Sequence, residues 1–235
     1  VVTYVPENKK CLTYGIIDPL VSVSPKTFSF ETTMRESYNH YNILAAITAC
    51  RELGIPDASI RKGIKTFTPP AGRGEIVYDK EFTVMIDFAH TPNSFQQVLS
   101  AIRPMVKGRL IHVFGSAGER DAQKRSLMGK ISSEFSDVIV LTSEDPRGED
   151  VRMIMRDIRK GMVQKETHPL PPPRRGYEVV EIPDRREAIA FAISSAKKGD
   201  FVLLTGKAHE KSMNYGNGEE AWDEFAVVEE MLNAK

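Results

Sequence analysis

From residue 73 onward, short apolar runs alternate with longer stretches in which apolar residues recur every three or four positions. The runs are rich in Val, Ile and Leu and are bounded by polar or turn-forming residues, which is typical of buried strands. The longer stretches have the period of amphipathic helices. Strands are predicted at residues 84–87, 110–114, 138–141, 178–182 and 201–204, and helices at residues 93–103, 124–134, 151–160, 185–197 and 223–232. This alternation predicts an α/β fold with a mostly parallel sheet and helices on both faces.

The first 71 residues have a different pattern. Short β-rich pieces precede two predicted helices; the pieces are at residues 1–5, 11–17, 21–23 and 27–32, and the helices at residues 42–53 and 57–67. Gly54 ends the first helix, and Pro69-Pro70-Ala71-Gly72 then breaks the chain. We therefore expect two units, residues 1–71 and residues 72–235.

Composition excludes several classes of function. Lys+Arg and Asp+Glu both number 32, so the formal net charge is zero. A general role on nucleic acid or on a membrane surface is therefore disfavoured, because both partners attract a basic excess. The two cysteines, Cys11 and Cys50, argue against a disulfide scaffold and against a thiolate zinc site. Because no apolar run has membrane-spanning length and no signal-peptide pattern is present, we expect a cytoplasmic protein.

Charged and glycine-containing loops follow four of the predicted strands. In an open parallel sheet such loops meet at one edge, which is where ligands bind. They comprise residues 87–92, 115–121, 144–147 and 205–210. In Glu144-Asp145-Pro146-Arg147, the arginine can grip a carboxylate with two hydrogen bonds, and the acids can hold an ammonium group. This loop predicts a site for a zwitterion such as an amino acid; the competing interpretation is a surface turn with a solvated salt bridge.

The positions of the histidines and the absence of two catalytic motifs limit the reactions that the chain could catalyse. His90 and His209 lie in these loops and are predicted to contact a ligand, whereas His112 lies within an apolar strand and is predicted to be a core residue. His90 and Asp87 have no third ligand at close spacing, so no metal site is predicted. The sequence contains no Gly-x-Ser-x-Gly hydrolase motif and no Gly-x-x-x-x-Gly-Lys-Ser/Thr phosphate loop.

Seven motifs, in order along the chain, resemble those of the Mur ligases, the ATP-dependent amino-acid ligases of peptidoglycan synthesis. They are Tyr38-Asn39-His40-Tyr41-Asn42 with the following Ile43-Leu44-Ala45-Ala46, Gly72-Arg73-x-Glu75, residues 87–92, residues 115–125, residues 144–147, Asp184-Arg185 with Ala188-Ile189, and Gly206-Lys207-Ala208-His209-Glu210. Within the family, the chain looks most like the type that makes the muramoyl tripeptide. The resemblance spans residues 38–210, and the first 35 residues match weakly.

The resemblance implies a three-domain ligase. This chain would hold the C-terminal part of the central ATP-binding domain, residues 1–71, and the Rossmann-like C-terminal domain, residues 72–235. The phosphate loop, the Mg²⁺ ligands and a modified lysine would lie upstream of residue 1, and this chain alone would be inactive. The whole enzyme would use ATP to phosphorylate the terminal carboxylate of a UDP-N-acetylmuramoyl dipeptide, and the amine of the new amino acid would then displace the phosphate.

The resemblance also implies a role for each motif residue. Asn39 and Asn42 would approach the adenine of ATP, and Arg73, as the catalytic residue, would reach its phosphates. Asp87 would accept hydrogen bonds from the ribose, and His90 would lie near the nucleotide. The incoming amino acid would be held by Arg120, Glu144, Asp145, Pro146, Arg147, Gly206 and Glu210.

The identity of that amino acid depends on residues 144–147. Members of the family that add meso-diaminopimelate end this motif in arginine, as Arg147 does here, so meso-diaminopimelate is favoured over L-lysine. Glu144 stands where the family has Asp, and Asp145 where it has Asn; the added charge of Asp145 would either favour a distal ammonium or pair with Arg147. The remaining alternatives are a lysine-adding or peptide-recycling Mur ligase and a non-catalytic module that binds an amino acid or a nucleotide. The same loop argues against a folylpolyglutamate synthetase.

Overall fold

The computed structural model describes residues 12–16, 22–32, 34, 37–162 and 176–235. It divides into two compact units, Val1–Pro69 and Pro70–Lys235. The strand expected at residues 1–5 lies outside the described residues. Of the helices in the described part of the chain, none is long and apolar enough to cross a membrane.

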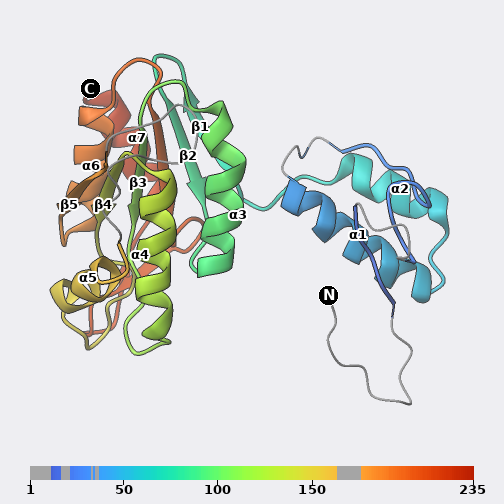
Figure 1. Ribbon diagram of the computed structural model, residues 1–235, viewed down its shortest axis with the longest axis horizontal. Coiled ribbons are helices and arrows are strands. Elements are labelled where there is room, and N and C mark those ends of the chain that lie inside the picture. The colour runs from blue at the N-terminus through green and yellow to red at the C-terminus, as the bar shows by residue number, and fades with distance from the viewer. Residues whose placement is uncertain (1–11, 17–21, 33, 35–36, 163–175) are drawn as a thin grey trace. The chain divides into compact units, whose positions relative to one another are not determined.

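The second unit is built on a six-stranded sheet. Its strands are β1 (Glu75–Asp79), β2 (Thr83–Asp87), β3 (Leu110–Phe114), β4 (Val138–Leu141), β5 (Glu178–Glu181) and β6 (Phe201–Thr205). They lie in the order β1-β2-β6-β3-β4-β5, and all neighbours are parallel except the edge pair β1–β2 (Figure 1). The expected mostly parallel sheet is confirmed, and the five predicted strands are present to within one residue at either end.

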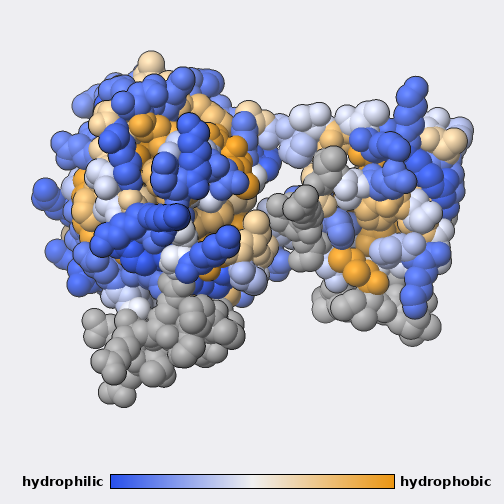
Figure 2. Space-filling view, turned by 90° about the horizontal axis from the view of Figure 1, so that it is seen from above, coloured by the Kyte–Doolittle hydropathy of each residue, from blue (hydrophilic) through white to orange (hydrophobic). Residues whose placement is uncertain are grey.

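Helices cover both faces of this sheet, as predicted. They are α3 (Pro92–Ile102), α4 (Gln123–Phe135), α5 (Val151–Arg159), α6 (Arg185–Ser195) and α7 (Glu224–Asn233), with a short 3₁₀ helix, η1 (Arg103–Met105), after α3. Side chains of hydrophilic residues make up much of the face of this unit that Figure 2 shows. The apolar sides of the helices are turned inward, so the sheet lies between two hydrophobic cores.

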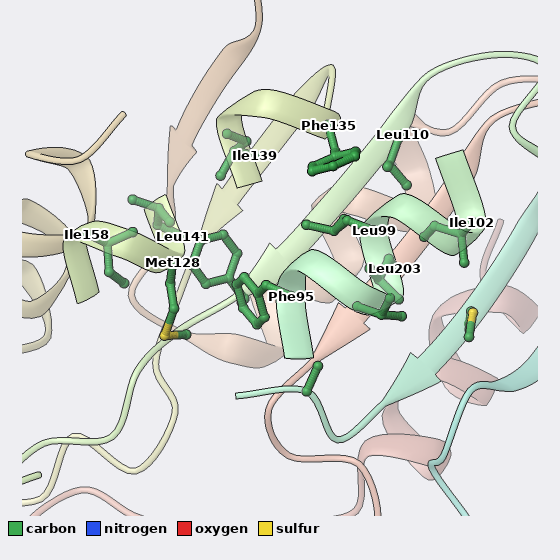
Figure 3. Close-up of a cluster of buried hydrophobic side chains, with 14 of the residues drawn as sticks. Phe95, Leu99, Ile102, Leu110, Met128, Phe135, Ile139, Leu141, Ile158 and Leu203 are labelled. Atoms are coloured by element: carbon green, nitrogen blue, oxygen red, sulfur yellow. The ribbon is translucent and has the colours of Figure 1, made fainter. Parts of the chain in front are cut away.

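The first core lies under α3, α4 and α5. Phe95, Met128 and Ile158, one from each helix, pack with Leu110 of β3 and Leu203 of β6 (Figure 3). All five side chains are inaccessible to solvent. Burying a side chain of this size contributes about 1.5–3 kcal/mol, so this core fixes the strands whose ends carry the candidate loops.

The second core lies on the opposite face, under α6 and α7. Side chains alternate along a strand, so Ile111 and Val113 of β3 enter this core with Ile189 of α6. Both helices begin at an aspartate that accepts backbone N–H bonds: Asp184 for α6 and Asp223 for α7. The Asp184 cap sets where α6 starts beside the ends of β4 and β6.

Three of the strands were not predicted: β1, β7 (Ser212–Asn214) and β8 (Glu219–Ala221). The last two form an antiparallel hairpin. β8 is exposed along its whole length, and β1 is exposed at three of its five positions. Neither β1 nor β8 has the alternation of apolar and polar residues that marks a half-buried strand, so neither could be predicted from such a pattern.

The described part of the first unit is a helix pair, α1 (Ser37–Glu52) and α2 (Asp57–Thr66). Its small core includes Phe28, Leu44, Ile47 and Ile60. The guanidinium groups of Arg51 and Arg61 lie over the Phe28 ring, 4.6 and 4.3 Å from its centroid.

The prediction of a strand at residues 27–32 is wrong. The backbone turns there, because the N–H groups of Thr27 and Phe28 both donate to the carbonyl oxygen of Ser24, and this turn places Phe28 in the core of the helix pair. Elsewhere in the described part of the β-rich region the structure has an isolated bridge between Tyr14 and Val23. A β-like composition therefore did not produce a sheet in this part of the chain.

Candidate functional site

Two loops at the carboxyl edge of the sheet meet the β7–β8 hairpin around residues 145–147. Gly118, after β3, donates its N–H to the Asp145 carbonyl oxygen at 3.0 Å and accepts a bond from the Arg147 guanidinium at 2.6 Å. From the hairpin, Asn214 accepts from the Arg147 N–H at 3.0 Å and donates its own N–H to the Asp145 carboxylate at 2.9 Å. The structure thus joins the loops after β3 and β4, both predicted to carry site residues, and adds the hairpin, which was not predicted.

The backbone of this loop is strained. Asp145 and Arg147 have φ angles of 42° and 51°, a left-handed conformation that costs about 1–3 kcal/mol for a residue other than glycine and clusters at ligand-binding sites. Pro146 between them is buried, and its carbonyl lies so close to Gly118 that a Cβ there would collide with it. The four hydrogen bonds around the loop offset the strain and fix the direction of the Arg147 side chain.

Lys207 is a buried cation beneath this loop. Its ammonium nitrogen is 2.9 Å from Asp145 Oδ1 and 2.8 Å from Glu210 Oε2, and its side chain is 1% exposed. Asp145 is therefore paired with Lys207, and the expected alternative of pairing with Arg147 is wrong. Lys207 was not among the predicted site residues, and its spacing of three residues from Glu210 was the available signal.

Glu144 is a buried acid at the centre of the site. Its side chain is 6% exposed, and Oε2 has no hydrogen-bond partner in the described part of the chain. Burial raises the pKa of Glu144 to about 7, against the opposing charges of Arg185, Lys124 and Lys207, while Asp145 raises it further. A Cβ on Gly206 would collide with this carboxyl group, so glycine at that position makes room for it.

Arg185 joins the ends of β4 and β6 to the starts of α6 and α7. It is fully buried and donates to both oxygens of Glu224, at 2.9 and 2.6 Å. Its remaining bonds go to the carbonyl oxygens of Ser143, at 3.2 Å, and Thr205, at 2.8 Å. Because Ser143 and Thr205 directly precede Glu144 and Gly206, Arg185 positions both site loops without needing to touch a ligand.

A second buried arginine, Arg125 of α4, holds the loop after β4 from the other side. Its guanidinium lies 2.9 Å from Glu149 and 3.2 Å from Asp157. Glu149 also accepts the N–H of Glu119 in the loop after β3. Paired arginines of this kind fix loop geometry through rigid, directional bonds.

Another group of side chains gathers at the end of β2. The guanidinium carbon of Arg73 lies over the Phe88 ring, 4.5 Å from its centroid, and the rings of His90 and His209 lie 4.8 and 4.7 Å from that centroid. Nδ1 of His90 is 2.8 Å from the Phe88 carbonyl oxygen, which orients the imidazole. Aromatic surface beside an exposed cation suits a nucleotide, whose base stacks and whose phosphates carry negative charge.

The remaining predicted residues are spread over both units. Asp87 ends β2 and is buried, with its carboxylate accepting from the Ala89 N–H at 2.7 Å. Arg120 is exposed in the loop after β3. Asn39 and Asn42 lie on α1 in the first unit. Within the described residues, no group of three His, Cys, Asp or Glu side chains is placed to hold a metal ion.

His112, predicted to be a core residue, is confirmed as one: it is inaccessible, and its ring nitrogens lie 2.9 Å from Ser132 Oγ and 3.1 Å from Thr205 Oγ1. A cavity of about 430 Å³ lies between the hairpin, α6 and α7, with Met213 and Trp222 in its wall. None of the predicted site residues lines it, so the bonded loops are the better candidate for the site.

Fold and site together define an α/β domain that presents paired charged side chains at the ligand-binding edge of a parallel sheet. Such an arrangement suits a zwitterion such as an amino acid. The family model "Mur ligase, glutamate ligase domain" matches residues 72–208. The chain belongs to the Mur ligase family.

Curated relatives include the UDP-N-acetylmuramoyl-L-alanyl-D-glutamate–2,6-diaminopimelate ligase of Aquifex aeolicus (strain VF5), 38% identical over 212 residues, which are 90% of this chain and 42% of that protein. The ligase of the same name from Clostridioides difficile (strain 630) is 40% identical over 194 residues, 82% of this chain and 38% of that protein. The chain therefore spans about two fifths of the length of these relatives.

A solved structure of a ligase of this name is similar, with a TM-score of 0.64 and 27% identity over 95% of this chain and 47% of that one. A pseudomurein peptide ligase type C from Methanothermus fervidus shares the fold, with a TM-score of 0.60 at 21% identity, over 87% of this chain and 37% of that one. The predicted α/β fold with its mostly parallel sheet agrees with both neighbours.

Proposed function

We propose that this chain forms part of an ATP-dependent ligase that adds meso-diaminopimelate to UDP-N-acetylmuramoyl-L-alanyl-D-glutamate in peptidoglycan synthesis. The names of the curated relatives support the reaction. The geometry of Arg147 carries the proposal. This residue is half-buried on a strained, tightly bonded loop, and within the described part of the chain one of its five side-chain N–H donors is used, on the Gly118 carbonyl oxygen. The free edge of its guanidinium suits a carboxylate, which the distal end of diaminopimelate has and that of lysine lacks.

The proposed reaction has two steps. The terminal carboxylate of the dipeptide takes the γ-phosphoryl group of ATP, and ADP leaves. The neutral amine of the new amino acid then attacks the acyl phosphate, forming the amide and releasing phosphate and a proton. Arg147 and Arg120 would hold carboxylates of the incoming amino acid, and Glu210 its ammonium, with Glu144, Pro146 and Gly206 shaping the pocket. The rate enhancement would come from positioning and from charge stabilisation.

Nucleotide binding is also part of the proposal. Arg73 would reach the phosphates from the surface of Phe88, with Asp87 on the ribose and His90 beside the nucleotide. Residues 1–71 would be the C-terminal part of the central domain, from which Asn39 and Asn42 approach the adenine, and residues 72–235 the C-terminal domain. Mg²⁺, which supplies charge neutralisation for phosphoryl transfer, would be bound outside the residues described here. A cytoplasmic location is proposed because ATP is a substrate.

Calorimetric titration of this chain with meso-diaminopimelate and with L-lysine tests the proposal. Diaminopimelate is expected to bind more tightly, and Arg147→Ala to weaken its binding by at least about tenfold, the equivalent of one charge-assisted pair. Arg152→Ala, at an exposed position early in α5, is the matched control and should bind normally. Tighter binding of lysine would reassign the substrate, and diaminopimelate binding that survives Arg147→Ala would remove Arg147 from the site.

A further inference from the structure

The charges around Lys207 form a layered arrangement. Asp145 and Glu210, whose side chains are 18% and 37% exposed, face outward, while Lys207, 1% exposed, lies beneath both. Asp145 is held a second time by the Asn214 N–H. The protein therefore places its own ammonium group where two partly exposed carboxylates would otherwise receive one from a ligand.

The acid at position 145, where the Mur ligase motif that the loop resembles has an amide, gives Lys207 a charged partner. A carboxylate so close to a buried ammonium is stabilised by it, and each would be strongly destabilised without the other. Asp145 and Lys207 thus act as a neutral pair. The Asp145 carboxylate is therefore not available to bind the ligand, and the Glu210 carboxylate is shared between Lys207 and solvent.

Four charged side chains of these loops balance one another. Asp145 and Glu210 carry two negative charges, and Lys207 and Arg147 carry two positive charges. A side chain that ends in both an ammonium and a carboxylate, as in diaminopimelate, leaves this balance unchanged. A side chain that ends in an ammonium alone adds an unmatched positive charge next to Lys207, and like charges at short range inside a protein repel strongly.

We propose that Lys207 is a specificity-determining residue, which occupies the cation position between Asp145 and Glu210 and so excludes amino acids whose side chain ends in a lone ammonium. The proposal rests on the function proposed above, because it takes the ligand to be the incoming diamino acid. In this proposal the site distinguishes diaminopimelate from lysine in two ways: Lys207 repels a lone distal ammonium, and Arg147 attracts a distal carboxylate. Specific binding sites commonly combine repulsion and attraction.

Two substitutions change the net charge of these four side chains in opposite directions. Lys207→Met leaves the two acids without their cation, so affinity for L-lysine is expected to rise by at least about tenfold, given the coupling energies of close charge pairs. Asp145→Asn leaves the cation partly unmatched, so affinity for L-2-aminopimelate, which has a distal carboxylate and no distal amine, is expected to rise by about tenfold. A gain of binding also proves that the variant has folded.

Calorimetry on the full chain provides the measurement. The double variant Asp145→Asn/Lys207→Met removes both charges and is expected to lose the gain for lysine, and Lys211→Met, at an exposed lysine, is expected to match the native chain. Lysine affinity that is unchanged or reduced in Lys207→Met, together with unchanged aminopimelate affinity in Asp145→Asn, would overturn the proposal. A gain that persists in the double variant would overturn it too.

The outcomes separate this inference from the proposed function. A native chain that binds no meso-diaminopimelate contradicts the function, while a gain of lysine binding in Lys207→Met still supports the selection by charge. A native chain that binds diaminopimelate, with neither gain seen in the variants, leaves the function standing and contradicts the role of Lys207.

Discussion

Replacing Glu144 by glutamine should stabilise the second unit at neutral pH and not at pH 4.5. Burial raises the pKa of this carboxyl from 4.5 to about 7, so the folded chain favours the protonated form. The native chain then bears no penalty below pH 4.5, an increasing one between pH 4.5 and 7, and a constant one above pH 7. Glutamine resembles the protonated acid and cannot ionise.

The size of the effect follows from the two pKa values. A pKa difference of about 2.5 at about 1.4 kcal/mol for each unit gives about 3.5 kcal/mol for complete ionisation, of which about 3 kcal/mol develops between pH 4.5 and 8. The free energy of unfolding of Glu144→Gln minus that of the native chain should therefore rise by about 3 kcal/mol between pH 4.5 and 8. Any constant effect of the amide cancels in this change, so the change is the quantity to compare.

Urea denaturation at several pH values provides the assay. Trp222, the only tryptophan in the chain, donates its indole N–H to Glu224 at 2.9 Å and reports on unfolding of this unit. Glu229→Gln, at an exposed position of α7, should differ from the native chain by no more than about 0.5 kcal/mol at any pH. A difference between Glu144→Gln and the native chain that stays flat from pH 4.5 to 8 would refute the assignment of Glu144 as an acid whose pKa is raised by burial.

Three further predictions test other parts of the site. Arg185→Met leaves Glu224 buried without its partner and should cost about 3–5 kcal/mol in urea denaturation; a loss under about 1 kcal/mol would contradict its role in joining the loops. Gly206→Ala adds a Cβ that collides with Glu144, so calorimetry should show weaker diaminopimelate binding. Gly218→Ala is the control, because Gly218 also has a positive φ (114°) but has open space around it, and this variant should bind normally. Equal effects of the two substitutions would rule out the collision as the cause. A double-mutant cycle with Arg73→Lys and Phe88→Leu should give a coupling free energy of about 0.5–1 kcal/mol, and zero coupling would mean that the Phe88 ring does not hold Arg73.

The sequence predicted the sheet well because its central strands are continuous apolar runs buried on both faces. It failed where that signal is missing: β1, β7 and β8 are short, and β1 and β8 are largely exposed. Residues 27–32 have a strand-like composition, but the backbone turns there and Phe28 packs in the core of the helix pair. The charged loops were also placed correctly at one edge of the sheet, because each directly follows a predicted parallel strand. It could not show which charges pair, because burial and partners are set by contacts distant in sequence. Lys207 and Arg185 were therefore named as motif residues without a role in the site.

Chemical-shift mapping of the ¹⁵N-labelled chain with meso-diaminopimelate tests the central claim most directly. The claim predicts saturable shifts of the backbone amides of Gly118, Asp145, Arg147, Gly206 and Glu210, which Arg147→Ala abolishes. Shifts confined to the residues that line the cavity beside α7, or no shifts at diaminopimelate concentrations in the millimolar range, would contradict the assignment of these loops as the amino-acid site.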